Sequence, residues 1–188
     1  MVEGKVVQHA FRMIASDLRR QAADACVSID VPAETSLLDA GDTCSELCYL
    51  VEGAVYQYNY LDETDLNIID LHVPGDWIFN HESFVSREKS KVGIKTFMPS
   101  KLLKLNLFAV HHLIGLSQQF LALGSILQDG RDRISFFDSK LGPKEKYDFI
   151  TRNKPEIIQA FPLKMIASYL KITPETISRV RSIKTDKK

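Results

Sequence analysis

The sequence predicts an α+β protein, in which an antiparallel β barrel or jelly roll precedes one long helix and a final group of helices. Three observations predict this fold. Short runs rich in β-branched and aromatic residues recur between Val27 and Leu105, separated by Gly and Pro turns. An apolar seam then runs from Ala109 to Leu141. The remaining residues have helical patterns and are strongly basic.

The first part of the chain combines helical and strand patterns. Residues 5–25 carry apolar side chains at helical spacing, which predicts one or two helices. The strand-like runs of residues 27–105 follow without helices alternating between them, which favours an antiparallel barrel or jelly roll over a parallel sheet. We therefore assign residues 1–107 to N-terminal helices and a β barrel.

The apolar seam repeats at alternating steps of four and three residues, as in a coiled coil. Its positions are Ala109, Leu113, Leu116, Phe120, Leu123, Leu127, Gly130, Ile134, Phe137 and Leu141. Gly142-Pro143, a strong helix breaker, follows the seam. We expect one helix over residues 108–142 that pairs with a second copy through residues 109–141, forming a homodimer. Packing of this helix on its own barrel is the alternative.

The formal net charge of zero hides two regions of opposite charge. Residues 1–139 hold 12 Lys and Arg against 19 Asp and Glu, a net charge of −7, whereas residues 140–188 hold 12 against 5, a net charge of +7. An acidic body joined to a basic tail is typical of a protein whose tail meets phosphate. A solvated basic face without a partner is the alternative.

The tail contains two short helical patterns, "PLKMIASYL" and "PETISRVR", each with Pro in its first turn. Thr173 directly precedes the second Pro and is a natural N-cap. Only residues 171–173 separate the two helices, which is the short connection of a helix-turn-helix. Apolar residues at matching positions predict a shared core: Ile166, Leu170, Ile172, Ile177 and Val180, with the small Ala167 at the crossing. We therefore assign residues 143–188 to a helix-turn-helix DNA-binding domain.

The second helix keeps a polar outer face that includes Ser182 and suits base reading. Arg179 can donate two hydrogen bonds to a guanine edge, and Glu175 can accept one from cytosine. Short polar side chains and lysine nearby suit phosphate contacts, which fix register. The predicted DNA-binding residues are Thr173, Glu175, Thr176, Ser178, Arg179, Lys164 and Ser168. The alternative is an ordinary helical hairpin with a surface ion pair between Glu175 and Arg179.

The order of these parts resembles the CRP/FNR family of bacterial transcription regulators, over nearly the whole chain. The stretch "ITPETISRVR" resembles the family's recognition helix, and the tail is especially similar to short regulators of Bacteroidetes-type bacteria. The resemblance implies a cyclic-nucleotide-binding-like barrel, a dimerisation helix and a winged helix-turn-helix. It also implies base reading by Glu175 and Arg179, and phosphate contacts from Thr173 and Thr176.

Two departures from the family pattern stand in the tail. Lys171 occupies the turn position where Gly is usual, so the turn differs or Lys171 adopts a strained φ. The chain also ends soon after Ser182, too soon for a C-terminal strand to complete a wing there.

The resemblance also locates a possible effector pocket: Phe79, Asn80, Lys89, Ser90 and Ser135. In family members that bind cyclic nucleotides, a Gly-Glu pair and an Arg-Ser/Thr pair hold the phosphate and ribose. Phe79 adds bulk at the Gly position, Asn80 lacks the carboxylate, and Lys89 lacks the bidentate geometry of Arg. We therefore do not expect cAMP to bind in the usual way. A different effector in the same hollow, or none, is expected.

The remaining features argue against other functional classes. No stretch approaches the ~20 apolar residues that span a bilayer, and the first residues lack the apolar block of a secretion signal. Three cysteines, Cys26, Cys44 and Cys48, indicate reduced thiols in the cytoplasm and are too few for a four-cysteine iron–sulfur cluster.

The spacing of Cys44 and Cys48 is too sparse for structural zinc, and the five histidines form no metal-ligand motif, so we expect no cofactor and no enzyme. The sequence thus predicts a homodimeric transcription regulator. The alternative is a small-ligand or cyclic-nucleotide sensor module whose main activity is ligand binding.

Overall fold

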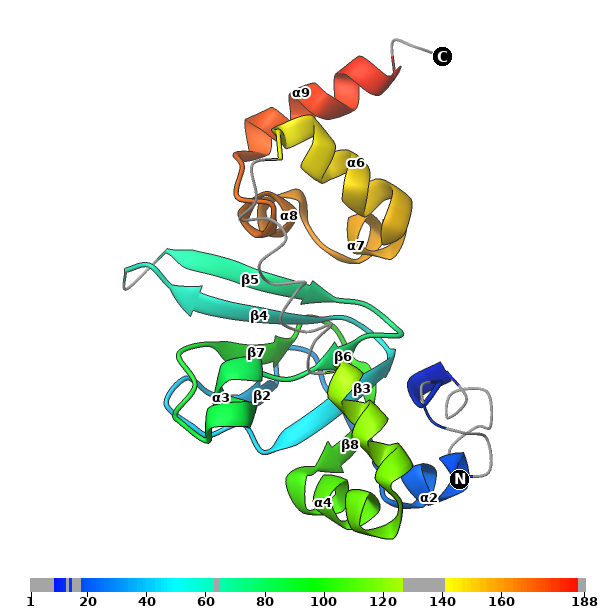
Figure 1. Cartoon of the computed structure of the whole chain (residues 1–188). Coiled ribbons are helices and arrows are strands. Elements are labelled where there is room, and N and C mark those ends of the chain that lie inside the picture. The colour runs from blue at the N-terminus through cyan, green and yellow to red at the C-terminus, as the bar shows by residue number, and fades with distance from the viewer. Residues whose placement is uncertain (1–8, 13, 15–17, 63–64, 127–140, 186–188) are drawn as a thin grey trace.

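Two four-stranded antiparallel sheets form the body of the protein (Figure 1). The computed structural model describes residues 9–12, 14, 18–62, 65–126 and 141–185. In the first sheet the strand order is β1 (Val27–Val31), β8 (Ser100–Asn106), β3 (Glu46–Glu52) and β6 (Trp77–Ile78). In the second it is β2 (Ser36–Leu38), β7 (Gly93–Thr96), β4 (Val55–Tyr60) and β5 (Leu66–His72). The predicted run of short antiparallel strands is confirmed.

Of the barrel or jelly roll that the sequence predicts, a closed barrel is not formed, because the two sheets stay open over the described residues. Strands β1 and β6 are the outer strands of the first sheet, and β2 and β5 are those of the second. The chain crosses between the sheets in tight turns instead of continuing one strand around a cylinder. Gly53, with φ +99°, lies in one such turn, and a Cβ there would come within 2.6 Å of the Pro99 carbonyl oxygen in the other. Only glycine fits this close approach without displacing backbone.

Apolar side chains cover both sheets on both faces. Between the sheets lie Cys48, Leu50, Val55, Ile78, Ile94 and Leu102. The outer face of the first sheet packs against α2 (Arg19–Asp24), the segment around Phe11, and the helices that follow β8. The outer face of the second sheet packs against the C-terminal helices through Tyr56, Ile68 and Leu71. The body and the tail therefore share one continuous apolar cluster.

The predicted single helix over residues 108–142 is wrong over its first half. Helix α4 (Leu107–Leu116) ends at Ser117, whose backbone is extended (φ −158°, ψ 134°). A separate 3₁₀ helix, η1 (Gln118–Leu123), begins there, and the Ser117 hydroxyl accepts a hydrogen bond from the Gln119 N–H at 3.3 Å. Serine in this capping role starts a new helical segment, which a heptad pattern does not reveal.

Several seam residues pack on their own body. Phe120 and Leu123 are buried in the cluster on the outer face of the first sheet, while Leu116 is 54% exposed. Residues 127–140, which carry most of the remaining seam, and Ser135 among them, lie outside the described residues. The homodimer through residues 109–141 therefore stays a prediction.

Four helices form the described tail: α6 (Pro143–Asn153), α7 (Pro155–Ala160), α8 (Leu163–Tyr169) and α9 (Pro174–Thr185). They lie over β4 and β5, on the side of the body away from α4 (Figure 1). Gly142 has an extended backbone, and its N–H donates to the Glu145 carboxylate at 2.7 Å, so α6 begins at Pro143 as predicted. Residues 141–185 contain no strand, so this part of the tail carries no wing.

Candidate nucleic-acid interface and sensor hollow

Helices α8 and α9 share the small core that the sequence predicts. Ile166, Leu170 and Ile177 are fully buried, and Val180 is nearly so. Ala167 is also buried, where a larger side chain would hold the helices apart. Because Ile177 and Val180 pack against α8, the opposite face of α9 points to solvent.

The turn between the two helices depends on an unusual backbone conformation at Lys171. Its φ is +56°, the left-handed region that favours glycine. The Ile172 N–H donates to the Ala167 carbonyl at 3.0 Å and the Lys171 N–H to that of Ser168 at 3.1 Å, which closes the end of α8. Of the two outcomes that the sequence left open, the strained φ is confirmed.

Thr173 caps α9, as predicted, and its hydroxyl oxygen accepts a hydrogen bond from the Thr176 N–H at 3.3 Å. In the first turn of α9, Glu175 accepts hydrogen bonds from its own N–H and from the Thr173 hydroxyl. These bonds, aided by the positive charge of Arg179, lower the pKa of Glu175. The helix N-terminus therefore presents a charged carboxylate one turn before a guanidinium.

The structure brings five of the seven predicted DNA-binding residues together on α9 and its cap. Glu175, Ser178 and Arg179 are exposed, as is Thr173, while Thr176 is partly exposed. The Ser178 hydroxyl donates to the Pro174 carbonyl at 3.1 Å, so it presents mainly its lone pairs outward. This exposed set combines hydroxyl, carboxylate and guanidinium groups within about two turns of helix.

The other two predicted residues, Lys164 and Ser168, lie on α8 beside β5. Lys164 is exposed, but the Ser168 hydroxyl oxygen accepts a hydrogen bond from the Ile68 N–H of β5 at 2.9 Å. Lys164, Ser168 and Thr173 together line a hollow of about 540 Å³ between α8 and β5. The same hollow includes Asp65 and Leu66 from the sheet side.

Lys171 adds contacts between the turn and β5 that no sequence pattern predicts. Its ammonium donates to Asn67 Oδ1 at 3.0 Å and to the Ile68 carbonyl oxygen at 3.2 Å. The signal in the sequence was the lysine itself, which stands where the turn favours glycine.

The possible effector residues are not brought together as a cyclic-nucleotide site. Phe79 is 3% exposed and packs edge-on against Phe84, with ring centroids 5.9 Å apart. Asn80 caps α3 (His81–Ser86), its Oδ1 accepting from the Ser83 N–H at 2.7 Å. The Ser90 hydroxyl donates to the Val92 carbonyl at 2.7 Å, and Lys89 is exposed. Each of these side chains is thus used within its own segment or points to solvent.

Polar side chains buried between the sheets fix the backbone at Phe79. Gln57 Nε2 donates to the Phe79 carbonyl oxygen at 3.1 Å and lies 3.0 Å from His72 Nε2. Asp70 and His72, which are neighbours on β5, are fully buried beside Gln57. The bulky Phe79 side chain is therefore held in place by a hydrogen-bonded network beneath it.

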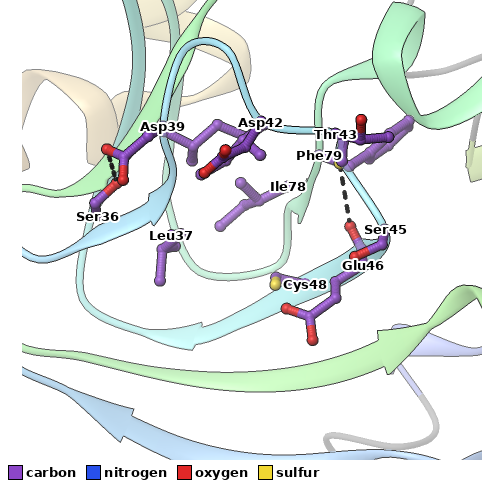
Figure 2. A pocket seen from close by; sticks show the side chains of 13 residues that line it. Ser36, Leu37, Asp39, Asp42, Thr43, Ser45, Glu46, Cys48, Ile78 and Phe79 are labelled. Carbon is purple, nitrogen blue, oxygen red and sulfur yellow. Dashed lines mark hydrogen bonds between the residues drawn. The ribbon is translucent and has the colours of Figure 1, made fainter. Parts of the chain in front are cut away.

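A hollow of about 450 Å³ opens between β2, β3 and the β6 segment (Figure 2). Its wall includes Phe79 of the predicted effector residues, together with the carboxylates of Asp39, Asp42 and Glu46. The described residues that line it include no Lys and no Arg. Glu46 is ion-paired with Lys104, but the carboxylates of Asp39 and Asp42 also lie on the wall, and they disfavour a phosphate there.

The described residues offer no reactive thiol pair and no metal-ligand cluster beside the hollow. All three cysteines are free, and burial raises the pKa of Cys48, on the wall of the hollow, to about 12. No three His, Cys, Asp or Glu side chains gather as metal ligands in the part of the chain that the structure describes. In that same part, no helix has the length and apolar character to cross a membrane.

No family model matches the sequence, and no curated protein does. The structure, in contrast, is similar to many solved structures. FixK2 from Bradyrhizobium japonicum aligns with a TM-score of 0.65 at 15% identity, over 86% of this chain and 85% of that one. A cyclic nucleotide binding protein from Ruegeria pomeroyi aligns with a TM-score of 0.65 at 11% identity, over 95% and 84% of the two chains.

A third solved structure carries a family description. It is a transcriptional regulator from Eubacterium rectale assigned to the CRP/FNR family, with a TM-score of 0.59 at 16% identity, over 94% of this chain and 86% of that one. At these identities the likeness establishes the fold: antiparallel sheets and helices arranged as in cyclic-nucleotide-binding-like proteins.

Proposed function

We propose that this chain is a homodimeric, sequence-specific DNA-binding regulator of transcription of the CRP/FNR type. The observation that carries the proposal is the exposed polar face of α9, presented by a tightly capped pair of helices on a basic tail. The fold likeness supports it, because the chain aligns along most of its length with a regulator assigned to that family. Reduced thiols suit a cytoplasmic location.

Each predicted residue has a role in this proposal. Arg179 donates to a guanine edge and Glu175 accepts from a cytosine, since both project from one side of α9. Thr173, Thr176 and Ser178 contact phosphates near the start of the helix, where the helix dipole also favours anions. Lys164 and Ser168 extend the phosphate contacts onto α8.

The homodimer would place two copies of α9 about 34 Å apart on consecutive major grooves. We place the contact between subunits in residues 109–141. Within the described half of this range, Leu116 and Leu121 are 54% and 60% exposed, and a partner chain could cover them.

A second candidate function is a small-ligand sensor whose main activity is binding in the body of the protein. The hollow of about 450 Å³ favours it, since this volume is in the range of small-molecule sites. Its carboxylates and the buried Phe79 argue against cAMP. Calorimetry with cAMP and cGMP separates the two candidate functions. We expect no heat of binding with either nucleotide, whereas micromolar binding would favour the sensor function.

The proposed function is tested by selecting bound fragments of the host genome and measuring affinity for the selected site. Arg179→Ala is expected to weaken specific binding by about 1–3 kcal/mol, a loss of about five- to 150-fold. Arg152→Ala is the matched control, because Arg152 is an exposed arginine at the end of α6. Equal affinity of Arg179→Ala and wild-type protein would contradict base reading by α9.

A further inference from the structure

At Ile68 the outward edge of β5 is covered by side chains from α8 and from the turn after it. Strand β5 is an outer strand of the second sheet, so one row of its main-chain groups has no neighbouring strand. At Ile68 both such groups are satisfied by the tail: the N–H by the Ser168 hydroxyl at 2.9 Å, and the carbonyl by the Lys171 ammonium at 3.2 Å. We call Asn67, Ile68, Ser168 and Lys171 the β5 clasp.

The backbone conformation of Lys171 connects the turn to this clasp. At φ +56° a glycine would sit without strain, whereas a lysine is strained. The lysine side chain makes two contacts with β5, to Asn67 Oδ1 and to the Ile68 carbonyl. Charged hydrogen bonds of this kind offset the backbone strain, so the lysine serves the closed arrangement of tail and sheet and not the turn itself.

Further contacts hold the tail against the body. The Lys154 ammonium lies 2.6 Å from Asp76 Oδ1 in the loop before β6, at a partly buried ion pair. The rings of Phe97 and Phe161 pack with centroids 5.3 Å apart. The tail therefore packs on the second sheet through one interface. The apolar cluster that they share forms the centre of this interface, and the β5 clasp lies at its edge.

This docked arrangement conflicts with the proposed DNA contacts of α8. Lys164, Ser168 and Thr173 line the hollow of about 540 Å³ beside β5, with the Asp65 carboxylate on the same wall. A hollow of this size, with β5 as one wall, accepts a small molecule but is too small to take in a DNA duplex. The Ser168 hydroxyl cannot accept the hydrogen bond from the Ile68 N–H and contact a DNA phosphate in the same state, because β5 occupies that side of α8.

We propose that the β5 clasp is an autoinhibitory contact: it holds α8 closed on the sheet, and DNA binding by the pair of helices α8 and α9 requires it to open. The inference rests on the proposed function, because it concerns competition between the strand edge and DNA phosphates for the same face of α8. An effector or partner that loosens β5 would then raise DNA affinity without touching α9.

Lys171→Gly is the decisive variant, because glycine suits the positive φ and removes the ammonium from the clasp. Charge alone predicts weaker DNA binding for this change, whereas an autoinhibitory clasp predicts tighter binding. We expect affinity for a selected site to rise about fivefold or more at fixed salt. Lys144→Ala, which removes an exposed cation from α6, is the charge control and is expected to weaken binding slightly.

A second variant acts on β5 and leaves the tail unchanged. Asn67→Ala removes an acceptor of Lys171 and is also expected to tighten DNA binding. Ser28→Ala is its control, because Ser28 is an exposed polar residue on β1 of the other sheet; it is expected to leave DNA affinity unchanged. Hydrogen exchange at the Ile68 amide, measured without DNA, is expected to speed up in Lys171→Gly and Asn67→Ala but not in Ser28→Ala.

The outcomes separate the clasp from the proposed function. If wild-type protein binds selected DNA and Lys171→Gly binds it more weakly, the clasp is overturned and the function stands. Unchanged Ile68 exchange in Lys171→Gly would overturn the clasp as well. Absence of DNA binding by every variant at low salt would overturn both.

Discussion

Lys146 of α6 donates a hydrogen bond from its ammonium to the main-chain carbonyl oxygen of Leu170, 3.0 Å away, at the end of α8. The lysine is 7% exposed, which is unusual for this residue type. A cation at a helix C-terminus satisfies a carbonyl that the helix itself leaves unpaired. This contact joins α6 to the turn that sets the direction of α9.

Lys146→Met is expected to lower the free energy of unfolding by about 1–3 kcal/mol, because the Leu170 carbonyl loses its partner in a buried place while the apolar stem is kept. Denaturant unfolding of the full chain measures it. Lys144→Met, at an exposed position of the same helix, is expected to change stability by less than about 0.5 kcal/mol. Equal stability of the two variants would show that the contact contributes nothing.

Gly53→Ala is expected to destabilise the protein by more than about 1 kcal/mol, because φ is +99° and the new Cβ would meet the Pro99 carbonyl at 2.6 Å. Gly124→Ala is the matched control: its φ is −58°, and an added Cβ meets nothing within 4 Å. This control is expected to be neutral or to stabilise by about 0.4–1 kcal/mol. Thermal unfolding compares the two, and a neutral Gly53→Ala would contradict the close approach of the two turns.

Alkaline pH is expected to destabilise the protein through Tyr56. Burial, together with the nearby Glu34 carboxylate, raises the pKa of Tyr56 to about 12. The folded state therefore holds this proton more tightly than the unfolded state, whose pKa is about 10. The resulting stability is complete below pH 10 and is lost as the pH rises towards 12.

Tyr56→Phe is expected to reduce this alkaline loss in part, as followed by denaturant midpoints between pH 9 and 11.5. The remaining loss belongs to other groups whose pKa burial raises: Cys26, Cys48 and Tyr49. Tyr60→Phe is the control, since Tyr60 is 59% exposed, and it is expected to retain the wild-type slope. A wild-type slope in Tyr56→Phe would assign the alkaline loss to other groups.

The carboxyl of Glu175 is expected to titrate below its ordinary pKa, and Thr173→Val is expected to bring it back up by removing a hydroxyl hydrogen bond. A depressed pKa contributes stability above the unfolded value, and this contribution is lost as the pH falls through the folded pKa. Side-chain carboxyl NMR measures both proteins. Thr151→Val, which removes a hydroxyl from α6, should leave Glu175 unchanged; a shift in this control would point to a general loss of structure.

The strands, turns and helix pair could be predicted because their signals are local. Gly53 and Gly75 adopt the positive φ that their turns require. Thr173 likewise caps the helix that follows it in sequence. Each of these features is decided within a few residues.

The structure differs from the sequence predictions where the conformation of a segment depends on contacts with residues distant in sequence. The seam continues through Ser117 in sequence, but the chain leaves the helix there so that Phe120 can pack on the body. The docking of Ser168 on Ile68 joins residues 100 positions apart, and no local pattern encodes it.

The covered edge of β5 also bears on the solubility of the protein. With the tail removed, Leu66 and Ile68 would stand on a bare strand whose main-chain groups can accept a strand from another molecule. Truncation before residue 143 would therefore produce intermolecular sheets and aggregation, although the two sheets of the body remain complete. When Ser168 and Lys171 contact β5, they prevent this edge strand from pairing with a strand of another molecule.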